Sequence, residues 1–96
     1  MAKIKTVLQT DNFKKIIKKL HKNEKADLDN AIRALIESPT LGEQKKGDLS
    51  FMHVYKFKMV KQLTLLGYSR HDNSIVLELI ALGSNENFYR DVKRIY

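Results

Sequence analysis

The sequence predicts an α+β fold in which an antiparallel sheet packs on an N-terminal helical hairpin and is completed by a C-terminal helix. Three features predict it: an alternating segment near the N-terminus, two helical segments that each carry one apolar stripe, and three strand-like runs before a last amphipathic segment. The expected order is β-α-α-β-β-β-α. Helices followed by a run of strands favour an α+β fold over a doubly wound parallel sheet.

The first half of the chain supplies one strand and the helical hairpin. Residues 3–9 alternate and predict the strand, and residues 10–12 (Thr, Asp, Asn) can cap the first helix. Asn23 can cap the second helix, which Pro39 should end near Ser38. The two apolar stripes consist of Phe13, Ile16, Ile17 and Leu20, and of Leu28, Ala31, Ile32, Leu35 and Ile36. Both stripes need an apolar partner, and the sheet is the expected one.

The second half predicts a loop over residues 40–50 and then the main sheet. The strands are expected at residues 53–60, 62–69 and 74–82, with turns at Lys61 and at residues 70–73. Gly67, inside a strand, predicts a bulge or a close backbone approach. Gly83 and Ser84 should end the sheet. A helix over residues 86–96 follows, with Phe88, Val92 and Ile95 on its apolar face.

Composition and charge narrow the classes of function. The chain has 96 residues, expected to form one domain over 1–96, and no cysteine, which excludes disulfides and thiolate metal sites. No apolar run reaches the ~20 residues of a membrane span and no signal peptide is visible, so we expect a cytoplasmic protein. Its net charge of +7 favours a polyanionic partner, although a merely solubilising surface has the same composition.

The clearest candidate for function is the strand that carries Lys56 and Lys58. Side chains alternate along a strand, so Tyr55, Phe57 and Met59 should face the helical hairpin while the two lysines face outward. Lys56 and Lys58 should then lie roughly 7 Å apart on a rigid strand, which is close to the phosphate spacing of a nucleic-acid strand. The alternative is the ordinary solvent-facing side of an antiparallel sheet.

Further basic residues could extend this face. They are Lys45 and Lys46 in the preceding loop, and Arg90, Lys93 and Arg94 on the last helix. The helical cations could equally complement the helix dipole at its C-terminus. Tyr89 lies off the apolar stripe, so it could stack on a base or transfer a proton, or simply be a partly buried packing residue.

The histidines and Glu78 are weaker candidates. His21, His53 and His71 lack the spacing of metal ligands, so no metal site is expected. His53 should pack in the core, and His71 should be a turn residue. Glu78 could partner Lys56 or Lys58, or point to solvent.

Three runs of sequence carry a resemblance to a known family. They are residues 42–49 (Gly to Leu), residues 54–58 (Val-Tyr-Lys-Phe-Lys) and residues 81–94, where the last strand meets the closing helix. In order and spacing these runs resemble RelE/ParE-superfamily toxins of type II toxin-antitoxin systems, and the resemblance covers essentially the whole chain. It implies the same β-α-α-β-β-β-α fold.

The resemblance to RelE-like members implies a ribosome-dependent endoribonuclease that cuts mRNA without a metal or other cofactor. It places Lys56 and Lys58 where RelE-like toxins have a functional lysine pair, and Tyr89 where they have a C-terminal tyrosine. Two positions depart from the pattern. Leu65 replaces an arginine, and Asn85 stands where relatives have arginine or histidine, so Asn85 can form hydrogen bonds but cannot carry charge.

Cleavage would require a base for the RNA 2′-hydroxyl, cations for the phosphorane and an acid for the 5′-oxygen. Lys56 or Lys58 could be the base and the other the phosphate clamp, with Tyr89 assisting and Arg90 and Arg94 on the backbone. The implied partners are a cognate antitoxin, the ribosome and mRNA. The alternatives are a ParE-like inhibitor of DNA gyrase and a non-catalytic RNA- or protein-binding relative.

Overall fold

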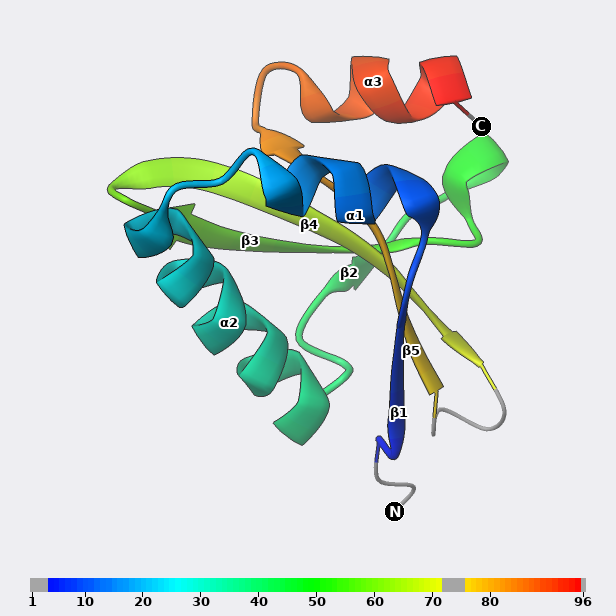
Figure 1. The fold of residues 1–96 in the computed structure, drawn as a ribbon. Helices are drawn as coiled ribbons and strands as arrows, with labels where there is room; N and C mark the ends of the chain where they lie inside the picture. Colours follow the sequence, from blue (N-terminus) through cyan, green and yellow to red (C-terminus); the bar gives the residue numbers. More distant parts are fainter. Residues whose placement is uncertain (1–3, 72–75, 96) are drawn as a thin grey trace.

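The computed structural model describes residues 4–71 and 76–95, which form a five-stranded sheet and three α-helices (Figure 1). The strands lie in the order β1-β5-β4-β3-β2. The elements are β1 (Thr6–Gln9), α1 (Asp11–Lys18), α2 (Lys22–Glu37), β2 (Glu43–Gln44), the 3₁₀ turn η1 (Gly47–Leu49), β3 (His53–Met59), β4 (Gln62–His71), β5 (Val76–Ser84) and α3 (Phe88–Ile95). The predicted α+β class and element order are confirmed, with β2 and η1 added inside the expected loop.

The sheet is mixed rather than wholly antiparallel. Strands β2 to β5 pair antiparallel with their neighbours, but β1 runs parallel to β5, from the Thr6–Val76 pair to the Gln9–Leu79 pair. The expectation of an antiparallel sheet is therefore wrong at this edge. The two strands are separated by most of the chain, and the direction of such a distant pairing is not written in local sequence pattern.

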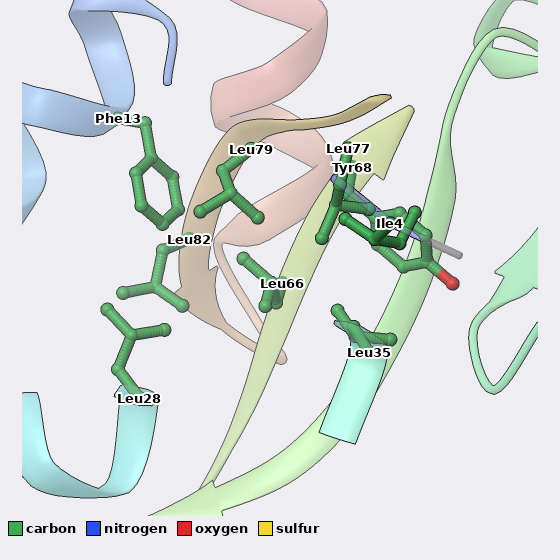
Figure 2. Close-up of a cluster of buried hydrophobic side chains, with 9 residues drawn as sticks. All are labelled: Ile4, Phe13, Leu28, Leu35, Leu66, Tyr68, Leu77, Leu79 and Leu82. Atoms are coloured by element: carbon green, nitrogen blue, oxygen red, sulfur yellow. The ribbon is translucent and has the colours of Figure 1, made fainter. Parts of the chain in front are cut away.

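The helical hairpin covers one face of the sheet and forms the first core with it. Phe13 from α1 and Leu28 and Leu35 from α2 meet inward side chains of β4 and β5 (Figure 2). This core consists of Ile4, Phe13, Leu28, Leu35, Leu66, Tyr68, Leu77, Leu79 and Leu82. The aromatic face of β3, with Tyr55, Phe57 and Met59, packs against the same core, as the alternation predicts.

Helix α3 covers part of the opposite face and forms a second core. Phe88 and Val92, each only 1% exposed, pack on side chains of β3, β4 and β5. This core consists of Leu49, Met52, Val54, Leu65, Ile80, Ala81, Phe88 and Val92. The predicted apolar stripe of the last helix is confirmed at Phe88 and Val92, while the Ile95 side chain lies outside the description.

A bulge beside Gly67 fits the sheet to α3. Gly67 pairs with Ala81 but Tyr68 pairs with Leu79, so Ile80 is an extra residue in β5. A Cβ atom on Gly67 would lie 2.6 Å from Met52 Sδ and 2.9 Å from Phe88 Cζ. Both readings of this glycine, a bulge and a close approach, are confirmed.

Two helix ends lie where the sequence predicts them, and one does not. The Thr10 side chain accepts a hydrogen bond from the backbone N–H of Phe13 and caps α1, as expected. Pro39 follows the end of α2, whose C-cap is Ser38. The expected cap at Asn23 is wrong, because α2 begins earlier with His21 as its N-cap. There the Glu24 carboxylate accepts from the His21 backbone N–H at 2.8 Å, a bond that stabilises the earlier start.

Several strand and helix ends also differ from expectation. Strand β1 begins at Thr6, so residues 4 and 5 precede it, and residue 3 lies outside the description. Strand β4 continues through Arg70 and His71, which were expected in a turn. The rest of that turn and the first two residues of the expected third strand, 72–75, are likewise outside the described residues, as is residue 96. Helix α3 begins at Phe88, two residues later than expected.

Across residues 4–71 and 76–95, no helix is both long and apolar enough to span a membrane.

Candidate nucleic-acid interface

Lys56 and Lys58 project from the face of β3 that α3 partly covers. Both are exposed, and they alternate with the half-buried Tyr55 and Phe57. Val54, which precedes Lys56 on the same face, is buried in the second core beneath α3. The predicted division of β3 into an aromatic face and a lysine face is therefore confirmed.

Tyr89 reaches this side of the sheet from the first turn of α3. It is half-buried against the second core, and its ring meets Phe88 edge-to-face, with ring centres 5.2 Å apart. Helix packing thus holds Tyr89 in place while part of its ring stays accessible. Tyr89 is thus a partly buried packing residue, as one interpretation of the sequence expected, and it also keeps the partial exposure that the other interpretation requires.

Lys45 lies over Tyr89 and connects the β2 segment, by which we mean residues 39–45, to α3. Its Nζ atom is 5.2 Å from the centre of the Tyr89 ring and 3.2 Å from Glu43 Oε1. Contact with the Tyr89 hydroxyl raises the pKa of Lys45, and Glu43 adds to the rise, while partial burial opposes it. Lys45 is therefore an anchored cation, unlike its exposed neighbour Lys46.

A shallow cavity of about 250 Å³ lies along the outer edge of the sheet and brings Lys45 and Lys56 together. Its lining consists of Leu41, Glu43, Lys45, Val54, Tyr55 and Lys56. The two cations of this hollow can contact a phosphate, while the Glu43 carboxylate, paired with Lys45, offsets part of their charge. The cavity was not anticipated, because β2 was expected to be part of a loop.

The basic residues of α3 do not all join this surface. Arg90 donates to Asn87 Oδ1, just before α3, at 2.9 Å and lies 3.8 Å from Asp91 of α3, so its guanidinium contacts residues near the start of its own helix. Arg94 lines a different cavity of about 240 Å³ between α1 and α3, beside Asn12 and Asp91. Lys93 is exposed, as is Asn85 in the turn before the helix. Arg94 thus lies beside α1, in a cavity that Lys45 does not line.

Tyr68 fixes the segment that carries Glu43 and Lys45. Its hydroxyl donates to the Pro39 carbonyl at 2.6 Å and accepts from the Gly42 N–H at 3.0 Å. A Cβ atom on Gly42 would collide with the Tyr68 ring. Burial raises the pKa of Tyr68, so the hydroxyl stays protonated and able to donate. Sequence reasoning missed this anchor, although a tyrosine within an otherwise apolar strand signals a hydroxyl that needs partners.

His53, His71 and Glu78 each contact another side chain of the fold. His53 stacks on Tyr68 with ring centres 5.4 Å apart, which confirms its packing role, and burial followed by Arg70 lowers its pKa. His71 is a strand residue rather than a turn residue, and its Nε2 lies 3.0 Å from Glu78 Oε1. Glu78 therefore partners His71 instead of Lys56 or Lys58. Within the described ranges, no three His, Asp or Glu side chains gather as metal ligands.

Solved structures with a similar fold include the toxin RelE of E. coli, alone and with its antitoxin. A double mutant of the E. coli toxin RelE in the free state is 24% identical and aligns over 100% of both chains with a TM-score of 0.67. The same mutant in complex with a peptide of the antitoxin RelBc is 24% identical over 100% of both chains, with a TM-score of 0.64. The intact E. coli RelBE toxin-antitoxin complex matches at 22% identity, over 82% of this chain and 94% of that chain, with a TM-score of 0.64. These matches show a shared fold.

Sequence comparison identifies the family. No curated protein matches the chain significantly. The family model described as a ParE-like toxin of type II bacterial toxin-antitoxin systems matches residues 7–93, nearly the whole chain. The chain therefore belongs to the ParE-like toxins of type II bacterial toxin-antitoxin systems, within the RelE/ParE superfamily.

Proposed function

We propose that this toxin is a ribosome-dependent endoribonuclease that cleaves mRNA without a metal ion. One observation carries the proposal: Lys56 and Lys58 stand exposed on the face of β3 over which α3 places Tyr89. Cations held on a rigid strand can bind a ribose-phosphate backbone, and an aromatic ring beside them can stack on a base. The structural similarity to E. coli RelE supports the same reading.

The reaction would begin with attack of an RNA 2′-oxygen on the adjacent phosphorus. The P–O5′ bond then breaks, which leaves a 2′,3′-cyclic phosphate on one fragment and a 5′-hydroxyl on the other. A base must take the 2′-hydroxyl proton, and an acid must protonate the departing 5′-oxygen. We assign the role of proton acceptor to Lys56 or Lys58 and charge stabilisation to the other lysine. Tyr89 would stack on a nucleobase of the RNA or assist proton transfer.

The surroundings of the lysine pair modify the assignment of the supporting residues. Leu65 pairs with Lys56 across the sheet and is fully buried, so it offers no charge there. Asn85 is exposed and neutral, so it can form hydrogen bonds with RNA but cannot stabilise charge as a cation would. Lys45 lines the same cavity as Lys56, and we therefore favour Lys45, with the exposed Lys46 and Lys93, over Arg90 and Arg94 for backbone binding.

Transcript mapping after induced expression tests the proposal. The wild type should arrest growth and produce new mRNA ends within translated codons, while Lys56→Ala and Lys58→Ala should each reduce these ends. Lys14→Ala is the matched control, because Lys14 is an exposed lysine of α1, which covers the opposite face of the sheet. Cleavage that persists in both lysine variants would remove the assignment of the catalytic residues.

A second candidate is inhibition of DNA gyrase, as in ParE-like relatives. The uncharged residues Leu65 and Asn85 favour it, because gyrase inhibition needs no ribonuclease centre. Gyrase-dependent DNA breakage in expressing cells, with intact transcripts, would establish this alternative. A protein that causes neither breakage nor cleavage and allows normal growth would instead be a non-catalytic relative.

We also propose that a cognate antitoxin neutralises this chain. Structures of E. coli RelE with RelB-derived partners supply the precedent. The net charge of +7 favours an antitoxin with an acidic, partly disordered segment. Co-expression with the product of a small neighbouring gene should restore growth and give a co-purifying complex that weakens as salt is raised.

A further inference from the structure

The turn between β3 and β4 has a backbone that its residues do not favour. Met59 pairs with Gln62, so Val60 and Lys61 are the two loop residues, with φ angles of +50° and +67°. Two-residue hairpins with positive φ at both positions strongly prefer Asn-Gly or Asp-Gly. A β-branched valine in the left-handed region is a genuine outlier, so other contacts must hold this turn.

A carboxylate from α2 supplies such a contact. Asp27 Oδ2 accepts a hydrogen bond of 2.7 Å from the backbone N–H of Val60, across 33 positions of sequence. The next residue of α2, Leu28, is 2% exposed in the first core, which fixes the helix at this point. The bond is charge-assisted and ties the hairpin tip to a rigid element.

Apart from Met59, which packs against the first core, the tip has little side-chain burial to hold it otherwise. Val60 is 43% exposed and Leu63 is 41% exposed. Lys58 pairs with Leu63, directly beside the last pair of the hairpin, whereas Lys56 pairs with Leu65 deeper in the sheet. Loosening of the turn should therefore reach Lys58 before Lys56.

We infer that Asp27 is a positioning residue, which holds the Val60–Lys61 turn closed and thereby places Lys58 on the RNA-binding face. The inference rests on the proposed ribonuclease function and adds to it a residue on the opposite side of the sheet. Asp27 itself contacts no RNA, because it acts through the backbone of Val60.

The kinetic test is a set of variants assayed for ribosome-dependent mRNA cleavage. Asp27→Ala should lower kcat about ten- to a hundredfold with little change in KM, since a misplaced group slows the chemical step. Asp29→Ala, an exposed carboxylate of the same helix, should match the wild type. In a Lys58→Ala background, Asp27→Ala should cause no further loss.

Repair of the turn provides the rescue. Asp27→Ala combined with Val60→Asn and Lys61→Gly should regain most of the lost rate, because Asn-Gly adopts this backbone unaided. The same turn replacement with Asp27 intact is the control. An additive loss in the Lys58→Ala background, or failure of the repaired turn to restore the rate, would overturn the inference.

Amide hydrogen exchange separates this inference from the proposed function. In Asp27→Ala the amides of residues 58–62 should exchange about tenfold faster or more, while amides in the first core keep wild-type protection. Unchanged exchange overturns the inference whether or not the protein cleaves RNA. If the wild type fails to cleave mRNA, the ribonuclease proposal falls, and faster exchange at the tip still supports the tether from Asp27.

Discussion

The Lys45 ammonium and the Tyr89 ring form a contact that joins the β2 segment to α3, with 5.2 Å between Nζ and the ring centre. Contact with the Tyr89 hydroxyl is the largest cause of the raised pKa of Lys45, ahead of opposing burial and of Glu43. Tyr89→Phe should therefore return the pKa of Lys45 toward its ordinary value, and Glu43→Gln should do so less. NMR titration of the Lys45 side chain measures both changes, and an unaltered titration in Tyr89→Phe would contradict the contact.

The same contact implies a pH window for stability. The pKa of Lys45 is higher in the folded protein than in the unfolded chain, so its contribution is fully present below about pH 10 and is lost as pH rises through the folded pKa. Urea unfolding of the wild type between pH 9 and 11, compared with Lys45→Met, tests the sign. The difference between the two proteins should shrink toward the alkaline end.

The hydroxyl of Tyr68 should contribute measurably to stability. Tyr68→Phe removes a donor to the Pro39 carbonyl and an acceptor for the Gly42 N–H, both partly buried. We expect a loss of about 1–3 kcal/mol in the free energy of unfolding, measured by urea denaturation. Tyr55→Phe, a half-buried tyrosine on the same face of the sheet, is the matched control. Equal losses in the two variants would show that the Pro39 and Gly42 bonds contribute little.

Local sequence pattern predicted the elements and the orientation of the lysine strand. Alternation alone separated Lys56 and Lys58 from Tyr55 and Phe57, and helical spacing identified the buried Phe88 and Val92. These predictions succeed because the periodicity of a strand or a helix decides which side chains face the core and which face solvent. That periodicity can be read from residues that are close together in the sequence.

Features that depend on distant pairing escaped prediction. The contact of Lys45 with Tyr89, the bonds from Tyr68 to the β2 segment and the parallel pairing of β1 with β5 each join residues far apart in sequence. No periodicity encodes them, because they arise only after the sheet order is set. His71 shows the same limit, since its bond to Glu78 depends on the register between β4 and β5.

Gly67 and Gly83 should respond differently to alanine. A Cβ atom on Gly67 would lie 2.6 Å from Met52 Sδ and 2.9 Å from Phe88 Cζ, whereas on Gly83 its closest contact would be 3.5 Å, to Phe88 Cα. We expect Gly67→Ala to cost about 1–3 kcal/mol of stability and to loosen α3, because Met52 and Phe88 are buried and cannot move freely.

Gly83→Ala serves as the control and should change stability little. Chemical denaturation measures both variants, and near-UV circular dichroism reports the packing of Phe88 and Tyr89. If Gly67→Ala is as stable as Gly83→Ala, the second core must be able to absorb a methyl group beside α3.

His53 should make the fold less stable in mild acid. Burial, with Arg70 as a second cause, lowers its pKa in the folded protein, so the unfolded chain binds a proton more readily. The contribution of the neutral ring is present above about pH 6.5 and is lost as pH falls toward the lower folded pKa. His53→Phe keeps the stacking on Tyr68 and has no proton to gain, so its stability should fall less between pH 7 and pH 5. NMR titration of the His53 ring gives a direct check, and a pKa at or above that of a free histidine would refute the prediction.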